Sequence, residues 1–419
     1  MSKSKTLEQI IIDLNKNKLS KVEANGLLIS LIESSDNLDN RVKCMEVLGK
    51  IIIKNEENYK IVENYLISDE NPLMRSVAAK ILFYQFPKIC INPLNWIIQN
   101  DKSILVLSTL FNLLKHSRKQ IFERLEKTLQ ERISNIYEVN PKEADFLLEI
   151  ESILSPNLEV GFFKPVKKNK HITALDFAGK KLIKLPSSIG ALSHLEHLNL
   201  WDNSLTTIPD SIESLSALKY LYLDWNNFEK FPDIQWDKLK SLERLSYTNN
   251  TLMEEIPKSF FKLIRQNFAD KYINEGVIFN EAPILGFLEV LTGIKLNKVK
   301  KKEKKFKLYA CEYKLNADGN IVGIYLYGYH SFQINYIPKQ LCFLKNLEEL
   351  VLRDQNITKI PIYIKDLLAL KHLDLRRNNV KFIPKSIKEL EFLEFLDLGE
   401  NKIRAIPEFI KDSGLNLWV

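Results

Sequence analysis

The 419-residue sequence is poor in cysteine and has no long apolar run. No segment approaches the ~18 uncharged apolar residues of a membrane span. The start of the chain lacks the apolar core and small-residue cleavage site of a secretory signal. No CxxC pair occurs, so neither a disulfide framework nor a structural zinc site is expected of the four widely spaced cysteines, Cys44, Cys90, Cys311 and Cys342. The expected location is therefore the cytoplasm.

Catalytic signatures are missing as well. The sequence has no GxxxxGKS/T phosphate loop, no GxGxxG after a strand pattern, no HExxH and no GxSxG. The six histidines are scattered, and the one close pair, His194 and His197, favours surface contact over metal binding. We therefore expect no enzymatic activity, no cofactor, no metal and no small-molecule substrate.

The positive charge is confined to one segment. The chain has 60 Lys and Arg against 53 Asp and Glu, a formal net charge of +7. Residues 295–307 contain eight lysines and a single acid, Glu303, so the remaining positive and negative residues balance. This distribution argues against a surface covered with nucleic-acid-binding charge.

A repeat of 23 residues in its regular copies dominates the rest of the chain. Two copies read LEHLNLWDNSLTTIPDSIESLSA, from Leu195, and LKHLDLRRNNVKFIPKSIKELEF, from Leu370. Their common form is LxxLxLxxNxLxxIPxxIxxLxx. Alternation points positions 4 and 6 of each copy into one core, and the Asn at position 9 can satisfy backbone groups of a buried turn. Copies begin at Ile172, Leu195, Leu218, Leu242, Ile321, Leu347, Leu370 and Leu393.

This pattern resembles the leucine-rich repeat, in the subclass with LP or IP after the Asn that is typified by Ras-group leucine-rich-repeat scaffolds. The resemblance implies an α/β solenoid with parallel strands on its concave face. Whether the two blocks of copies form one continuous arc stays open at this point.

The first 155 residues follow a different, helical period. The segments DNLDNRVKCMEVLGK, from Asp36, and DENPLMRSVAAKILFYQ, from Asp69, place Arg41 and Arg75 alike, near a spacing of 34. They resemble HEAT-type helical repeats, which implies an all-α stack before the solenoid. The expected organisation is a HEAT-like domain at 1–155, a basic linker or cap at 156–171, leucine-rich repeats 1–4 at 172–263, an insertion at 264–320, and leucine-rich repeats 5–8 with a C-terminal cap at 321–419.

The insertion combines three local patterns. Residues 281–296 predict a short amphipathic helix entered near Pro283 and ended around Gly293. A lysine run follows. Asp318-Gly319 then predicts a hairpin between the strand-like runs 306–313 and 321–327. The string NADGN is similar to part of a calcium loop, but the later bidentate acid is missing, so we favour the turn.

Repeat positions 3, 5, 7 and 8 predict the face on which a partner binds. Aromatic residues gather there in the second, third and fifth copies. Cross-strand pairing of aromatics on a sheet is one explanation. We favour a protein-binding hot spot, because Trp, Tyr and Arg dominate such sites. The predicted contact residues are His197, Asn199, Trp201, Asp202, Tyr220, Tyr222, Asp224, Trp225, Tyr325, Tyr327, Arg353, Asp374, Arg376 and Arg377.

The lysine segment has three interpretations, namely a solvated loop, a contact with anionic lipid or an acidic protein, and a nucleic-acid contact. The residues concerned are Lys300, Lys301, Lys302, Lys304 and Lys305. The sequence as a whole predicts a non-enzymatic scaffold that binds a protein partner on the concave face, with signalling or small-GTPase regulation implied by the Ras-group resemblance. The alternative is an adaptor that associates with nucleic acid or an anionic membrane through these lysines.

Overall fold

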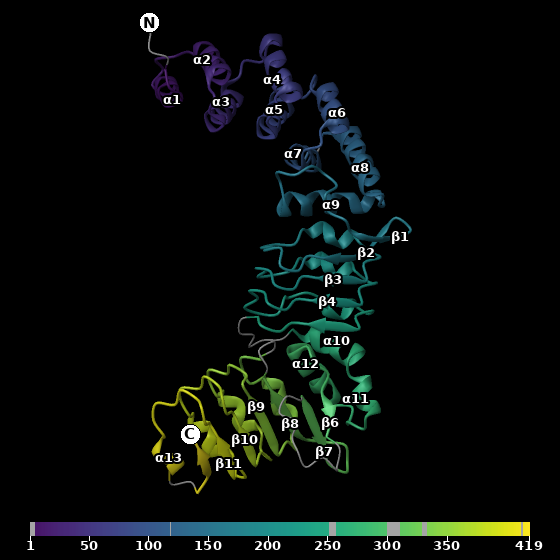
Figure 1. Ribbon diagram of the computed structural model, residues 1–419, viewed down its shortest axis with the longest axis vertical. Coiled ribbons are helices and arrows are strands. Elements are labelled where there is room, and N and C mark those ends of the chain that lie inside the picture. The colour runs from purple at the N-terminus through teal and green to yellow at the C-terminus, as the bar shows by residue number, and fades with distance from the viewer. Residues whose placement is uncertain (1–4, 118, 251–256, 300–310, 329–332, 412–413) are drawn as a thin grey trace. The chain divides into compact units, whose positions relative to one another are not determined.

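The computed structural model describes residues 5–117, 119–250, 257–299, 311–328, 333–411 and 414–419 (Figure 1). The chain divides into two compact units. The first comprises Met1–Lys164 and Asn169–His171, and the second comprises Pro165–Lys168 and Ile172–Val419. Among the described residues, no helix is both long and apolar enough to cross a lipid bilayer.

The first unit consists of helices joined by short turns. Polar caps begin several of them: Ser20 and Glu23 form a reciprocal capping box at α2, and Asn71 caps α5 with Pro72 in its first turn. The helices are α1 (Leu7–Asn15), α2 (Lys21–Ser34), α3 (Leu38–Ile51), α4 (Glu56–Ser68), α5 (Pro72–Gln85), α6 (Ile91–Asn100), α7 (Ile104–Lys115), α8 (Glu123–Tyr137) and α9 (Pro141–Leu154).

Polar contacts recur between successive helix pairs of this unit. The buried amides of Asn25 and Asn58 are hydrogen-bonded at 3.0 Å, and the hydroxyls of Ser76 and Thr109 at 2.9 Å. Both pairs are separated by 33 residues. Contacts at a constant sequence separation are the mark of stacked repeats. The predicted all-α helical-repeat domain is confirmed.

The second unit begins with parallel strands, one from each repeat. The sheet runs in the order β1-β2-β3-β4-β5, and the pairs from β2 to β5 are parallel. The strands are β1 (Val166–Lys168), β2 (His171–Asp176), β3 (His197–Asn199), β4 (Tyr220–Tyr222) and β5 (Arg244–Ser246). Each Pro after a strand is followed by a short helix, namely η2 (Ser187–Ala191), η3 (Asp210–Ser214), η4 (Trp236–Lys238) and α10 (Lys258–Asn267).

Helices separate this sheet from the next, and a hairpin belongs to the second sheet. The helices are α11 (Asp270–Asn274) and α12 (Ala282–Thr292). The strands β7 (Glu312–Leu315) and β8 (Ile321–Tyr327) pair antiparallel, with Gly319 in the turn between them at a φ of +82°. The side chain of Asn316 accepts hydrogen bonds from the amides of Asp318 and Asn320, so this residue orders the turn.

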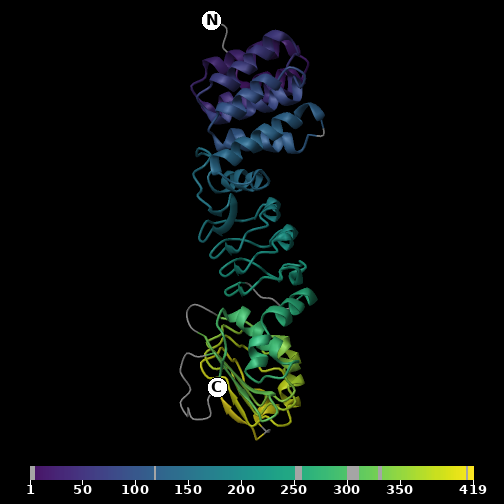
Figure 2. The ribbon, with the colours of Figure 1, turned by 90° about the vertical axis from the view of Figure 1, so that its right-hand side faces the viewer.

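A second sheet contains the remaining repeats, in the order β12-β11-β10-β9-β8-β7-β6. All pairs from β8 to β12 are parallel. Its further elements are β6 (Asn297–Lys298), η5 (Lys339–Phe343), β9 (Glu349–Arg353), η6 (Ile362–Asp366), β10 (His372–Asp374), η7 (Lys385–Glu389), β11 (Phe395–Asp397), α13 (Glu408–Lys411) and β12 (Asn416–Trp418). The repeats therefore form two sheets, and within this unit Figure 2 shows strands on one side and short helices on the other.

The repeat pattern explains this core. Leu198, Leu221 and Leu245 lie opposite one another in the register and are buried. The Asn of position 9 acts as predicted: Asn226 accepts from the Leu205 amide at 3.0 Å and donates to the Leu200 carbonyl at 2.9 Å. Each such side chain thus satisfies backbone groups of two neighbouring turns. The predicted α/β leucine-rich-repeat solenoid, with an all-α helical-repeat domain before it, is confirmed.

Candidate partner-binding face

The strand register brings aromatic side chains of neighbouring repeats together on the first sheet. His197 lies opposite Tyr220 and Tyr220 opposite Arg244, so position 3 forms a row across three strands. The rings of His197 and Tyr220 stack with centroids 4.4 Å apart. The Arg244 guanidinium also lies 5.8 Å from the ring centroid of Tyr222. Tyr222 is at repeat position 5, in the row next to that of position 3. These side chains form one polar and aromatic surface on the first sheet. We call it the strand face and define it by His197, Tyr220, Tyr222 and Arg244.

Two tryptophans extend the strand face at the ends of β3 and β4. Trp201 and Trp225 are 42% and 44% exposed. The amide of Asp202 donates to the carbonyl of Asp224, and that of Asn203 to the carbonyl of Trp225, so the two turns are hydrogen-bonded neighbours. Asn199 accepts from the Trp201 amide at 3.1 Å, which holds the start of the turn.

The turns share an unusual backbone conformation. Asp202, Trp225 and Asn249 occupy repeat position 8, and each has a φ of 54°. This left-handed region is sterically costly for residues other than Gly, at about 1–2 kcal/mol. Asn and Asp tolerate the conformation well, whereas a bulky residue rarely adopts it. Trp225 therefore adopts this conformation at a cost in stability.

Asp224 does not belong to the strand face, and the prediction that it contacts a partner is wrong. The residue is 5% exposed. Its carboxylate accepts from the Thr248 amide at 2.7 Å, from the Thr248 hydroxyl at 2.6 Å, and from the Ser246 hydroxyl. A buried carboxylate needs such donors, and here the fourth repeat supplies them. Asp224 joins the third and fourth repeats.

Tyr325 and Asp374 are likewise buried, so their predicted contact with a partner is also wrong. The Tyr325 hydroxyl donates to Glu349 Oε2 at 2.6 Å, and its ring fills the space beside Gly323, where an added Cβ would lie 2.5 Å from the hydroxyl oxygen. Asp374 is 1% exposed and accepts from Arg353 Nε at 2.7 Å. Both side chains stabilise the second sheet.

The three arginines among the predicted contact residues are largely neutralised within the chain. Arg376 Nη2 lies 2.6 Å from Glu400 Oε1, and Arg377 Nε lies 3.0 Å from Glu400 Oε2. The hydrogen bonds from Arg376 and then Arg377 lower the pKa of the Glu400 carboxyl. Arg353 is paired with Asp374. Carboxylates of the chain itself therefore already balance much of the positive charge of these arginines.

The predicted contact residues thus separate into three groups. Asp224, Tyr325 and Asp374 are buried. The half-buried group is Asn199, Tyr220, Tyr222, Tyr327, Arg353 and Arg376. The exposed group is His197, Trp201, Asp202, Trp225 and Arg377. The candidate anion-binding residues Lys300, Lys301, Lys302, Lys304 and Lys305 lie outside the described residues and stay a prediction.

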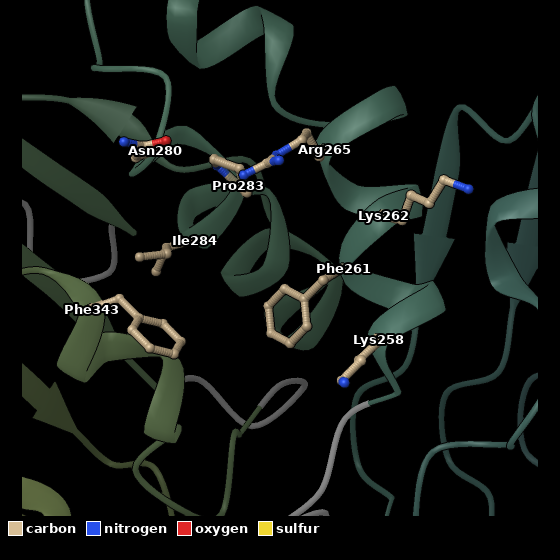
Figure 3. Close-up of a pocket in the computed structure, with 8 residues that line it drawn as sticks. All are labelled: Lys258, Phe261, Lys262, Arg265, Asn280, Pro283, Ile284 and Phe343. Atoms are coloured by element: carbon tan, nitrogen blue, oxygen red, sulfur yellow. The ribbon is translucent and has the colours of Figure 1, made fainter.

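A cavity on the other side of the repeats was missed from the sequence. It has a volume of about 470 Å³ and lies among α10, the first turn of α12 and η5 (Figure 3). The lining residues are Lys258, Phe261, Lys262, Arg265, Asn280, Pro283, Ile284 and Phe343. The signal that could have revealed it is the helical spacing of Lys258, Phe261, Lys262 and Arg265.

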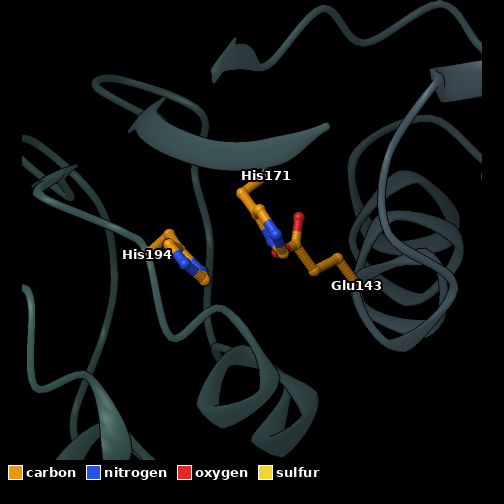
Figure 4. A group of neighbouring side chains, drawn as sticks. All are labelled: Glu143, His171 and His194. Carbon is orange, nitrogen blue, oxygen red and sulfur yellow. The ribbon is translucent and has the colours of Figure 1, made fainter. Parts of the chain in front are cut away.

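The end of the first unit contains an ordered polar pair. His171 Nδ1 and Glu143 Oε1 lie 2.8 Å apart, and Glu143 is buried (Figure 4). The amide of Asn140 also donates to the Lys170 carbonyl at 2.7 Å. These bonds attach residues 169–171 to the start of α9, so the pair has a structural explanation. His194, drawn in the same figure, belongs to the second unit.

The cysteines are poor nucleophiles. All are buried without a disulfide. Burial raises the pKa of the Cys44 thiol. It raises the pKa of Cys90 and of Cys342 to about 11, and that of Cys311 to about 12. Because the thiolate is the reactive form, these side chains are inert near neutral pH.

Comparison with known proteins supports the repeat assignment. Residues 148–265 match the family model described as "Leucine-rich repeat region", and residues 345–403 match "Leucine rich repeat". No curated protein sequence matches the chain.

Similar solved structures include a leucine-rich-repeat protein of Leptospira interrogans, with 24% identity and a TM-score of 0.22 over 59% of this chain and 72% of that one. The plant peptide hormone receptor RGFR1 in complex with RGF2 has 21% identity and a TM-score of 0.22, over 55% of this chain and 28% of the receptor chain. The PEPR1–AtPEP1 structure has 21% identity and a TM-score of 0.24, over 76% and 34%. This chain thus spans about a third or less of the length of the matched chains in these two structures.

Proposed function

We propose that this chain is a non-enzymatic scaffold that binds a protein partner on the strand face of the first sheet. The observation that carries the proposal is the pair of half-exposed tryptophans, Trp201 and Trp225, on adjacent hydrogen-bonded turns. Trp225 persists there in a backbone conformation that bulky residues rarely adopt. Neither ring is needed to close the leucine core, which lies on the inward positions of the repeats.

The surface has the physical properties of a hot spot. Trp and Tyr bury about 150–250 Å² each and contribute much of the binding energy at protein interfaces. The side chains stand on parallel strands whose backbone is already ordered, so little conformational entropy is lost on binding. Asp202 is exposed beside the two tryptophans. We therefore propose a partner that inserts an apolar side chain between the tryptophans and places a basic group near Asp202.

The second sheet is proposed as a lesser contact. Tyr327 and Arg353 are half-buried there, and Arg376 and Arg377 are tied to Glu400. The Ras-group resemblance of the repeats suggests small GTPases or other cytoplasmic signalling proteins as the first class to test. The HEAT-like first unit is proposed to present its own extended surface, as stacked helical repeats do.

The proposal can be tested by affinity purification and mass spectrometry of the full chain. The triple variant Trp201→Ala, Tyr222→Ala, Trp225→Ala should lose the proteins that the unmodified chain enriches, with a change in unfolding free energy of no more than about 2 kcal/mol. Phe382→Ala with Phe392→Ala is the matched control, because both rings are exposed but lie away from the strands of the first sheet. Equal capture by the triple variant would refute the proposal.

A further inference from the structure

The cavity beside α10 combines an apolar floor with positive charge. Pro283 and Ile284 are buried at its base, and Phe261 is half-buried. Phe343 lies at the opposite side and is 63% exposed. Figure 3 shows the two rings on either side of the opening. An apolar group that entered here would remove both rings from water.

Among the described residues, three cations and no acid belong to the lining. Lys258, Lys262 and Arg265 lie along one face of α10, while Phe260, Leu263 and Ile264 of the same helix are buried. Lys262 is paired with Asp237 at 2.5 Å, and the Arg265 guanidinium lies 5.2 Å from the ring centroid of Phe279. Within the described residues, Lys258 has no ion-pair partner.

Among the described residues, the buried carboxyl of Glu281 forms no ion pair with these cations. Its carboxylate accepts a hydrogen bond from the Ile321 amide of β8 at 2.6 Å. The cavity therefore keeps a net positive rim around an apolar floor. This combination is complementary to an apolar group flanked by carboxylates.

The spacing of the cations favours a peptide over a small carboxylate. Lys258 and Arg265 are seven residues apart, which is roughly 10 Å along a helix axis. In an extended peptide, residues i, i+2 and i+4 share one face and span roughly 13 Å. Two acids at the outer positions can thus reach the two cations with their flexible side chains, while the central residue enters the cavity. A single carboxylate would engage only one end.

We propose that this cavity is a second binding site, on the short-helix side of the repeats and separate from the strand face, for an acidic peptide segment with a bulky apolar residue between two carboxylates. The site is formed by α10 of the fourth repeat and η5 of the fifth, together with α12 from the insertion between them. The interruption of the repeat pattern therefore creates a pocket that uninterrupted copies would lack.

The test uses fluorescence anisotropy of the full chain with a labelled peptide that carries Glu, Phe and Glu at alternate positions within Ser and Gly flanks. We expect a dissociation constant on the order of 10–100 μM, weakening as salt is added. Replacing the peptide's Phe by Ala should weaken binding at least tenfold. Lys258→Glu with Arg265→Glu, and separately Phe343→Ser, should each do the same.

Lys388→Glu is the matched control, since it reverses an exposed lysine on η7, away from the cavity. Circular dichroism should show unchanged folding of every variant, because the altered side chains are exposed. The proposal is overturned if the peptide does not bind at millimolar concentration, or if Lys388→Glu weakens binding as much as the cavity variants do. It is overturned as well if the peptide with Ala in place of Phe binds with the same dissociation constant. It is also overturned if decanoate binds the cavity and the peptide does not. The strand-face triple variant should bind the peptide normally, which separates this site from the proposed scaffold function.

Discussion

Arg75 binds both carboxylate oxygens of Asp101, with Nε to Oδ2 at 2.7 Å and Nη2 to Oδ1 at 3.1 Å. Arg75 Nη1 also donates to the carbonyls of Asp69 and Glu70. The preceding repeat has a corresponding ion pair, between Arg41 and Asp69. Each arginine therefore joins its own repeat to the next one.

We predict that Arg75→Ala lowers the unfolding free energy of the first unit by about 3 kcal/mol, because it leaves a buried carboxylate without its charged partner. Urea denaturation followed by circular dichroism measures this change. Arg124→Ala, at an exposed position of α8, should cost less than about 0.5 kcal/mol. Equal effects of the two substitutions would contradict the linking role.

Asn226 should be among the most sensitive polar residues of the solenoid. Its amide makes hydrogen bonds to backbone groups of two turns, so Asn226→Ala should destabilise the second unit by about 3 kcal/mol. The adjacent Asn227 is exposed and contributes its backbone amide to the Leu205 carbonyl, which Asn227→Ala retains. Thermal denaturation of both variants provides the comparison, and a similar melting temperature would show that the buried amide is dispensable.

Asp202 and Asp224, which lie on adjacent hydrogen-bonded turns, should behave differently. Asp224→Ala should lower the unfolding free energy by about 2–3 kcal/mol, since it leaves the buried hydroxyls of Ser246 and Thr248 without their acceptor. Asp202→Asn should leave stability unchanged and weaken partner capture, because the residue is exposed and Asn tolerates its backbone conformation. Chemical denaturation and affinity capture of both variants test the distinction. Wild-type stability in Asp224→Ala would restore Asp224 to the candidate contact surface.

Trp225 should show a trade-off between stability and binding. Trp225→Asn places a residue suited to the left-handed conformation at this turn, so the unfolding free energy should rise by about 0.5–1 kcal/mol while partner capture falls. Trp201 has no positive φ, so Trp201→Asn should reduce capture without the gain in stability. A loss of stability in Trp225→Asn would mean that the ring packs more tightly than its exposure indicates.

The thiols should resist labelling in the folded chain. Their raised pKa values mean that the thiolate becomes abundant only at higher pH than for an exposed cysteine. At pH 8 we expect negligible reaction with Ellman's reagent in the native state and four equivalents in guanidinium chloride. Raising the pH towards 10 should increase the native rate. Rapid labelling of a native thiol at pH 8 would contradict this prediction and identify a reactive cysteine.

The repeat pattern alone determined the strands, their register and the buried leucine rows. Leu198, Leu221 and Leu245 recur at one position of neighbouring copies, so each can stack on the next without reference to the rest of the chain. The same regularity predicted that Trp201 and Trp225 lie outside the core, because positions 7 and 8 follow the last inward leucine. Local periodicity carries this information since each repeat contacts chiefly its neighbours.

Only the tertiary structure decided which polar residues are exposed for contact with a partner and where a cavity forms. Asp224, Tyr325 and Asp374 occupy positions that the pattern marks as outward, yet donors or acceptors more than 20 residues away enclose them. The cavity beside α10 depends on side chains from two repeats and from the insertion between them, which the repeat pattern does not describe. Burial and cavity shape arise from such non-local packing, whereas a repeat pattern specifies only the direction in which each side chain leaves its own strand.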